Sequence, residues 1–266
     1  MSAAEPAELF RQDNLVAWCI VPFDAKQRTP AQRAEMLDRL GIKHVAYDWR
    51  AKHVPEFEDE ILQYKKHSLN YFAFWSWHEA MEPLIRRHNI QPQIWLMMKN
   101  STLESQGERV ADAAAGLLPM VRKAADMNLK VGIYNHGGWA GEPANMIAVC
   151  EHLQAEHDVD NVGIVYNFHH GHEHIADFQA LFERMQPWLL CVNINGMADA
   201  EEVASGRNKI LPVGDGQHEV GMLKVVAASG YTGPIGILDH RNDIDAEESL
   251  RQNLQGLRNV VRDQLR

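Results

Sequence analysis

The chain has 266 residues, of which 45% are hydrophobic, and it carries a formal net charge of −10. This length is enough for a full core, and the acidic charge argues against a nucleic-acid partner because phosphate binding needs a basic surface. No apolar run approaches the roughly 20 residues of a membrane span, and the first residues lack the apolar segment of a signal peptide. Three cysteines without CxxC spacing indicate reduced thiols and a cytoplasmic protein.

Strands and helices alternate along the sequence. Residues 1–13 are expected to form a leader or a short N-terminal helix, and residues 14–266 a single domain. The predicted strands cover residues 15–21, 44–47, 70–75, 93–98, 130–134, 161–166, 188–193 and 234–238. The predicted helices cover residues 30–40, about 55–67, a segment ending at His88, 105–127, about 143–155, 177–185, 219–229 and 246–264. Thr29 is a suitable N-cap for the first of these helices, and Gly41 is suited to end it.

Strand–helix alternation with short connections predicts right-handed βαβ units around a parallel sheet. Eight such units in about 250 residues favour a closed (β/α)8 TIM barrel over an open doubly wound sheet. No GxGxxG sequence follows the first strand, so the phosphate-binding turn of a dinucleotide fold is missing. The fold class is therefore predicted to be α/β, with a single barrel.

Polar side chains follow the predicted strands. The segment 161–174 reads NVGIVYNFHHGHEH, and the strand before it is followed by Asn135 and His136. Because active sites of such barrels lie at the carboxyl ends of the strands, these residues are expected to meet at one face. His172 and His174 are expected on a solvated rim of that face. Trp49 and Trp77 follow strands, where they either stack on a sugar ring or only pack against the protein.

The second half of the sequence resembles the sugar phosphate isomerase/epimerase family of xylose isomerase-like TIM barrels. The residues that carry the resemblance are GIYNHGG (132–138), VGIVYNFHHGH (162–172), CVNING (191–196) and GDGQHEVGMLKVVAASGYTGPIGIL (214–238). The opening stretches NLVAWCIVPFDA and HVAYDWR further resemble an uncharacterised bacterial branch of that family. The resemblance implies a small-molecule carbohydrate substrate and is compatible with a homo-oligomer such as a dimer or tetramer.

Members of this family usually hold a divalent metal between a Glu, an Asp, a His and a second Glu at strand ends. Mapped onto this chain, these positions are Tyr134, Asn167, Asn193 and Leu238. None of the four is a carboxylate, and Asn offers a hard cation only a weak neutral oxygen. The cofactor is therefore left unassigned. If a metal is held, His136, His170 and Asp239 are its candidate ligands.

These observations favour a sugar or polyol isomerase, epimerase or lyase that moves a proton next to a carbonyl. His136 and His170 are the predicted acid/base residues. The predicted substrate-binding residues are Asp48, Trp49, Trp77, Asn135, Asn167, His169, Asn193, Asn195, Asp239 and His240. Two alternatives remain open: a degenerate barrel that binds a sugar without catalysis, and a metal enzyme with a rebuilt site. The rebuilt site would draw its ligands from His136, His169, His170, Asp239 and His240.

Overall fold

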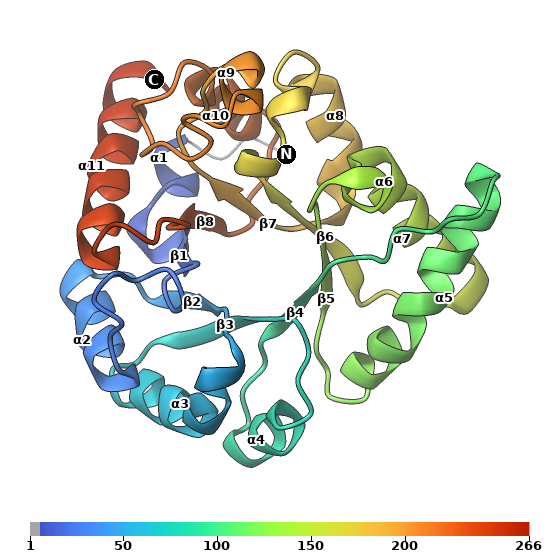
Figure 1. Cartoon of the computed structure of the whole chain (residues 1–266), viewed down its shortest axis with the longest axis horizontal. Helices are drawn as coiled ribbons and strands as arrows, with labels where there is room; N and C mark the ends of the chain where they lie inside the picture. The colour runs from blue at the N-terminus through green and yellow to red at the C-terminus, as the bar shows by residue number, and fades with distance from the viewer. Residues whose placement is uncertain (1–5, 266) are drawn as a thin grey trace.

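Eight parallel strands close into a barrel in the computed structural model, which describes residues 6–265 (Figure 1). Each strand pairs with its neighbours in chain order, and β8 pairs with β1. The strands are β1 (Leu15–Trp18), β2 (His44–Tyr47), β3 (Asn70–Trp75), β4 (Gln93–Leu96), β5 (Val131–Tyr134), β6 (Val162–Asn167), β7 (Leu189–Ile194) and β8 (Ile235–Leu238). The predicted (β/α)8 TIM barrel is confirmed.

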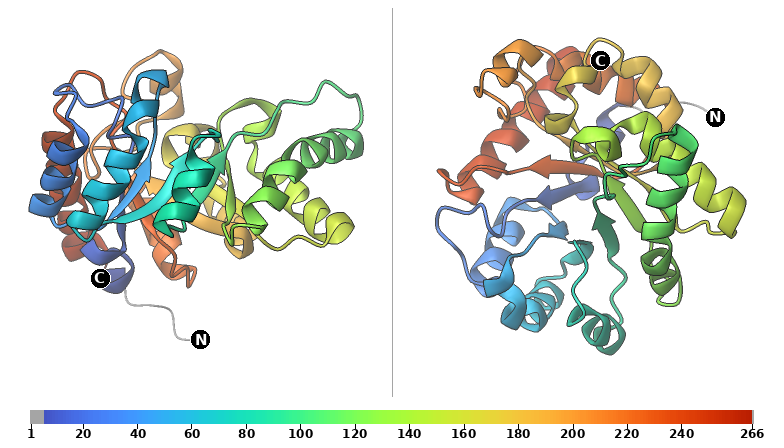
Figure 2. Two further views of the ribbon diagram at one scale, coloured as in Figure 1. Left: turned by 90° about the horizontal axis from the view of Figure 1, so that it is seen from below. Right: turned by 45° about the vertical axis from the view of Figure 1, so that its right-hand side comes forward.

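The helices lie outside the ring of strands, as Figures 1 and 2 show from three directions. They are α1 (Pro6–Leu9), α2 (Pro30–Leu40), α3 (Phe57–Lys66), α4 (Met81–His88), α5 (Gln106–Ala125), α6 (Gly138–Gly141), α7 (Pro143–His157), α8 (Phe178–Met185), α9 (Ala200–Ala204), α10 (Glu219–Ala228) and α11 (Ala246–Gln264). Short 3-10 turns are η1 (Gln12–Asn14), η2 (Ala51–Glu56), η3 (Phe168–His170), η4 (His172–His174) and η5 (Gln186–Trp188). No helix among residues 6–265 combines the length and apolar character needed to cross a membrane.

Local sequence signals account for the ends of several elements. The Thr29 side chain accepts a hydrogen bond from the backbone of Gln32, and Gly41 ends α2 with φ of +71°. The predicted N-cap and terminator of this helix are thus confirmed. By contrast, β1 is shorter than the predicted strand 15–21. Cys19 has φ of +61°, in the left-handed region, so the extended backbone ends at Trp18.

Large aromatic side chains fill the inside of the barrel. Trp18, Trp95 and Tyr134 are buried there among small residues from the other strands. A Cβ atom added to Gly132 would lie 2.6 Å from a methyl group of Val165 and 3.0 Å from the Trp95 ring. Glycine at this position therefore leaves the space that the indole of Trp95 fills, as close packing of a barrel interior requires.

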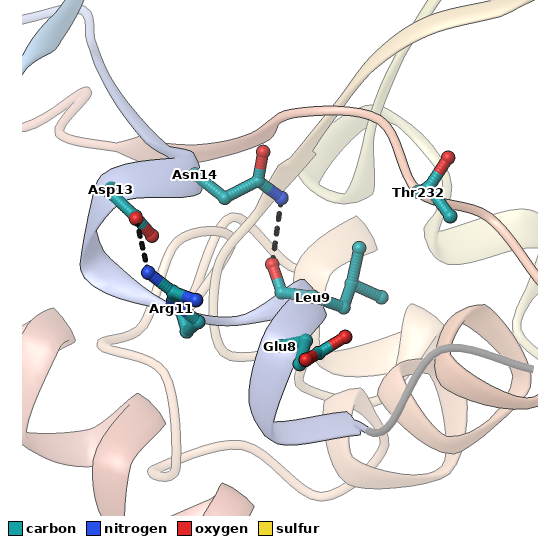
Figure 3. A pocket seen from close by; sticks show the side chains of 6 residues that line it. All are labelled: Glu8, Leu9, Arg11, Asp13, Asn14 and Thr232. Atoms are coloured by element: carbon teal, nitrogen blue, oxygen red, sulfur yellow. Dashed lines mark hydrogen bonds and ion pairs between the residues drawn. The ribbon is translucent and has the colours of Figure 1, made fainter.

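The segment before β1 packs at the amino end of the barrel, where Leu9 and Phe10 are buried. A hollow of about 410 Å³ lies beside it (Figure 3). Its lining residues are Glu8, Leu9, Arg11, Asp13, Asn14 and Thr232. Arg11 pairs with Asp13 at 2.6 Å, and the Asn14 amide donates to the carbonyls of Leu9 and Gly233. Because these polar groups bond to one another, we assign the hollow a structural role. Residues 1–5 of the predicted leader lie outside the described residues.

Candidate functional site

A cavity of about 270 Å³ opens at the carboxyl end of the barrel. It is lined by Trp18, Cys19, Phe23, Asp48, Arg50, Trp75, Tyr134, His136, His169, His170 and His240. These residues end or follow β1, β2, β3, β5, β6 and β8. Parallel strands deliver their carboxyl ends to the same face, and this common direction brings side chains more than 200 residues apart in sequence into one cavity.

The wall formed by β1, β3 and β5 is aromatic. The ring centroids of Trp18 and Trp75 are 5.6 Å apart with tilted planes, and those of Trp75 and Tyr134 are 4.6 Å apart in an edge-to-face arrangement. The indole N–H of Trp18 donates to the Tyr134 hydroxyl at 3.0 Å. Rings held in this way offer apolar faces against which the C–H groups of a sugar can pack.

Four histidines form another part of the lining. The ring centroids of His169 and His170 are 3.6 Å apart, those of His136 and His170 are 4.5 Å apart, and those of His169 and His240 are 5.6 Å apart. Both ring nitrogens of His169 and Nδ1 of His240 are buried without a hydrogen-bond partner. Free donors and acceptors at this density in a buried cluster indicate a place where a polar ligand binds.

Three of these histidine rings, those of His169, His170 and His240, are held neutral. Burial, with smaller contributions from the neighbouring His136 and Lys209, lowers the pKa of His170 to about 3. Burial likewise lowers the pKa of His240 to about 4. The pKa of His169 lies well below its ordinary value for the same reason, with His170 as the next contribution. At neutral pH each of these three rings therefore presents one N–H donor and one bare nitrogen.

Two buried carboxyl groups follow β2 and β8, and the first of them, Asp48, lines the cavity. Burial raises the pKa of Asp48 to about 7, and the nearby Arg50 guanidinium opposes this rise only in part. Burial also raises the pKa of Asp239 to about 7, against a smaller opposing effect of the Ser249 hydroxyl. The side-chain oxygens of Asp48 and Asp239 make no hydrogen bond of normal geometry. Carboxyl groups that titrate near neutrality in a cleft are suited to acid/base chemistry.

Four buried asparagines lie at or near the carboxyl ends of β5, β6 and β7. Asn135 holds the end of β6, because its side chain accepts from the backbone N–H of Asn167 at 2.7 Å and donates to the Asn167 carbonyl at 3.1 Å. The amide of Asn167 itself is fully buried without a partner. Asn193 and Asn195 are also fully buried, and each keeps one unpaired polar atom.

Ionic contacts hold the loops around the cavity. Arg28 pairs with Asp24 at 2.8 Å and with Asp245 at 2.6 Å, which ties the loop after β1 to the loop after β8. Glu219, at the start of α10, is fully buried. Its carboxylate accepts backbone hydrogen bonds at 3.0 Å from Met197, Gly214 and Gly216, and so organises the long loop after β7.

A second hollow, of about 260 Å³, adjoins the cavity and shares His169 and His170 with it. His172 lines this outer hollow and is only 6% exposed. The expectation that His172 lies on a solvated rim is therefore wrong. The turns η3 and η4, which the sequence did not predict, curl the segment inward and bury this ring. His174 remains partly exposed and bonds to Glu142 at 3.1 Å.

The structure brings five of the predicted site residues into the central cavity: Asp48, His136, His169, His170 and His240. Seven others do not line it: Trp49, Trp77, Asn135, Asn167, Asn193, Asn195 and Asp239. Asn167, Asn193, Asn195 and Asp239 are fully buried.

The two predicted sugar-stacking tryptophans point elsewhere. The indole of Trp49 donates to the Trp75 carbonyl at 2.7 Å and packs on Phe57. Trp77 bonds to Glu79 and lies under the Lys123 ammonium group. The aromatic rings of the cavity belong instead to Trp18, Phe23, Trp75 and Tyr134. Strand-terminal position could have identified Trp18, Trp75 and Tyr134, because the last residue of a barrel strand can face the mouth.

The donor set at the family's metal positions does not fit a divalent cation. The Tyr134 hydroxyl is occupied by the Trp18 indole, and Leu238 has no donor atom. Asn167 and Asn193 supply only amides, which are weak ligands for a hard cation. Throughout the described part of the chain, no three His, Cys, Asp or Glu side chains are grouped as ligands for a metal ion. The rebuilt metal site considered from the sequence is thus not formed by His136, His169, His170, Asp239 and His240.

No protein-family model and no curated protein sequence matches the chain. Solved structures match it well. The apo form of the 3-keto-D-glucoside 4-epimerase YcjR from E. coli matches with TM-score 0.68 and 13% identity, over 92% of this chain and 99% of that chain. The probable 3-DHS dehydratase AsbF from Bacillus anthracis matches with TM-score 0.66 and 16% identity, over 92% and 98% of the two chains. An IolI protein with a bound zinc atom matches with TM-score 0.69 and 12% identity, over 93% and 97%. The chain therefore has the xylose isomerase-like TIM barrel fold.

Proposed function

We propose that the protein is an enzyme that moves a proton next to a carbonyl group of a sugar or sugar-like polyol, as an isomerase, an epimerase or a lyase. The observation that carries the proposal is the cavity at the carboxyl end of the barrel. It combines an aromatic wall with unpartnered imidazole groups and the unpartnered carboxyl group of Asp48. The structural neighbours, an epimerase of a keto-glucoside and a probable dehydratase among them, support a carbohydrate-modifying enzyme of this kind.

The proposed acid/base groups follow strands on opposite sides of the barrel. In a closed ring of eight strands, β2 lies across from β6. Asp48 follows β2, whereas His170 follows β6 and His136 follows β5. A substrate carbon between these residues has titratable groups on both faces. Removal of its proton on one side and return on the other inverts the carbon, whereas return on the same side at the neighbouring carbon isomerises the sugar.

In the proposed mechanism, His136 and His170 exchange the proton with the substrate. The neutral His170 ring can accept a proton at pH 7, but its low pKa makes it a weak base in the empty cavity. Negative charge that develops on the substrate oxygen after proton removal would raise this pKa, because an opposite charge favours the imidazolium. The same charge would be stabilised by Arg50 and by ring N–H donors of His169 and His240. No step is assigned to a metal.

A sugar-binding barrel without catalysis is the second candidate. It is favoured by the low pKa values of His170 and His240, which disfavour proton uptake, and by the loss of every carboxylate from the family's metal positions. Such a protein would use the same cavity and the same aromatic wall. It differs from the enzyme only in leaving the carbon–hydrogen bonds of its ligand intact.

Solvent exchange separates the two candidates. The purified protein would be incubated in D2O with D-fructose, L-ribulose and a 3-keto-glucoside, and incorporation of deuterium at carbon would be followed by NMR. The enzyme is expected to exchange at least one carbon-bound proton, and the exchange is expected to disappear in His136→Ala and His170→Ala. Binding of a sugar by calorimetry with no exchange of any carbon-bound proton would instead identify the binding protein.

A further inference from the structure

Apart from His169 and His170, the outer hollow is lined by residues that the proposed reaction does not use. We define the outer pocket by Glu142, His172, His174, Val203 and Lys209, together with the two rings His169 and His170 that it shares with the central cavity. Its other walls are glycine and alanine residues and Glu173. The two hollows therefore adjoin at these shared rings.

His172 carries a polar atom for which the protein provides no partner. Its Nδ1 lies 3.2 Å from the carbonyl oxygen of His169. A carbonyl oxygen can only accept, so Nδ1 holds the proton and Nε2 is left as an acceptor. Nε2 is buried and makes no hydrogen bond. Burial and the nearby Lys209 keep the ring neutral by lowering its pKa. A buried acceptor without a donor calls for a ligand that brings one, such as a hydroxyl group.

The charges of the outer pocket disfavour an anion. Glu142 and Glu173 line it together with a single cation, Lys209. Glu142 is also engaged by His174 at 3.1 Å. A phosphate group would approach two carboxylates in order to reach one exposed ammonium group, whereas phosphate sites use clustered cations. A neutral unit with several hydroxyl groups suits the mixture of donors and acceptors better.

The volumes of the two hollows also bear on the size of the ligand. The central cavity and the outer pocket have volumes of about 270 and 260 Å³, and each is smaller than the roughly 300–1,000 Å³ of ordinary ligand sites. Taken together through their shared histidines, they fall inside that range. The inner part has the aromatic rings and the acid/base groups, and the outer part has only polar and small side chains.

We propose that the outer pocket is a second sugar subsite, and that the natural ligand is a disaccharide or other glycoside rather than a free monosaccharide. One unit would lie against Trp18 and Trp75, and the second would donate a hydroxyl to Nε2 of His172. The proposal rests on the proposed function, in that it assumes a sugar in the central cavity. It adds the size of the ligand and the residue that recognises its second unit.

The test compares sugars of one and two units on the full chain. Binding of D-glucose, D-fructose, cellobiose, maltose, sucrose and glucose 6-phosphate would be measured by titration calorimetry. At least one disaccharide is expected to bind about tenfold or more tightly than its own monosaccharides, since a second unit adds hydrogen bonds. Equal binding of mono- and disaccharides would overturn the proposal, and so would preference for the phosphorylated sugar.

Two variants test whether the outer pocket causes the higher affinity for the disaccharide. His172→Phe keeps a ring but removes the acceptor, and Ala204→Trp fills the pocket from α9. Both are expected to lose about tenfold in disaccharide affinity and to leave monosaccharide affinity within about twofold. Glu201→Trp adds the same bulk to an exposed position of α9 outside the pocket and should change neither. Unchanged disaccharide binding in both variants would contradict the assignment, and retained monosaccharide binding shows that each variant is folded.

The outcome also separates this proposal from the proposed function. Disaccharide binding that depends on His172, without deuterium exchange, would support the second subsite and contradict the proposed catalysis. Deuterium exchange on a monosaccharide, with no higher affinity for any disaccharide, would support the catalysis and contradict the subsite. Absence of binding by every sugar of the panel would contradict both.

Discussion

The ring centroids of His136 and His170 lie 4.5 Å apart, although the two residues follow different strands. At this distance His136 is the largest contribution after burial to the lowered pKa of His170. A positive charge on His136 therefore disfavours a proton on His170.

Removal of either ring should abolish proton exchange. His136→Ala and His170→Ala are each expected to slow deuterium incorporation into a substrate by roughly 100- to 10,000-fold, the usual contribution of a positioned acid or base. The effects should not add in the double variant, because the rings act on one proton. His152→Ala, on the outer helix α7, is the matched control and should retain the wild-type rate. Full exchange in both single variants would refute the assignment.

Asp48 should make the protein less stable as the pH rises. Its pKa is raised from an ordinary value of about 3.9 to about 7, so the folded state keeps the proton longer than the unfolded state. Stability from this group is full below the unfolded pKa and is lost as pH rises through 7. Asp48→Asn should therefore stabilise the protein by on the order of 1–3 kcal/mol at pH 8, and by much less at pH 4. Urea unfolding at the two pH values measures this.

The same Asp48→Asn variant should be impaired in function. A buried carboxyl that destabilises the fold is retained where chemistry needs it, which is the ordinary conflict between stability and activity. Asp48→Asn is expected to slow deuterium exchange while it raises the free energy of unfolding. A variant that is more stable and fully active would show that Asp48 has no part in the reaction.

Sugar binding should depend on Trp75 and not on Trp49. Trp75 lines the cavity, whereas Trp49 packs behind it on Phe57 with its indole N–H bonded to backbone carbonyls. Trp75→Ala is expected to weaken sugar binding by up to about tenfold through loss of the stacking face, which is worth roughly 0.5–1.5 kcal/mol. Trp49→Ala should lower the unfolding temperature and leave the affinity of the folded protein nearly unchanged. Calorimetric titration and thermal unfolding separate the two effects.

Glu219 should be needed for the long loop after β7. Its buried carboxylate accepts three backbone hydrogen bonds, from Met197, Gly214 and Gly216. Glu219→Ala leaves these N–H groups without an acceptor and should lower the free energy of unfolding by roughly 2–4 kcal/mol. Hydrogen exchange should become faster at Met197 and Gly216 than in the strands. Glu202→Ala, on the exposed helix α9, is the control.

Chelation should have no effect on the fold or on proton exchange. The four positions where the family holds a metal offer two amides, an occupied hydroxyl and an aliphatic side chain. EDTA treatment is expected to leave the unfolding temperature and the deuterium exchange rate unchanged, and plasma mass spectrometry of the untagged protein should find well under one equivalent of Zn, Mn, Co or Fe. About one equivalent retained after brief chelation would contradict this prediction.

Much of the architecture could be predicted because it depends on local signals. Eight buried runs with polar sequences after them predicted the strands, and caps such as Thr29 and Gly41 predicted helix ends. The same pattern correctly gathered Asp48, His136 and His170 at one cavity, since strand direction alone decides which ends meet. Strand lengths were less predictable. The end of β1 depends on the left-handed backbone at Cys19. A cysteine in the sequence does not predict this conformation.

The direction of each side chain was decided only by the tertiary structure. Trp49 and Trp77 follow strands just as the cavity residues do, yet they turn toward neighbouring helices, while Trp18 and Trp75 face the cavity. His172 is drawn inward by two short turns whose stability comes from packing rather than from their own sequence. The amino-acid sequence by itself thus determined the barrel and the polar character of its carboxyl end. Which side chains share a cavity, and which of their atoms lack partners, depends on packing between segments far apart in the chain.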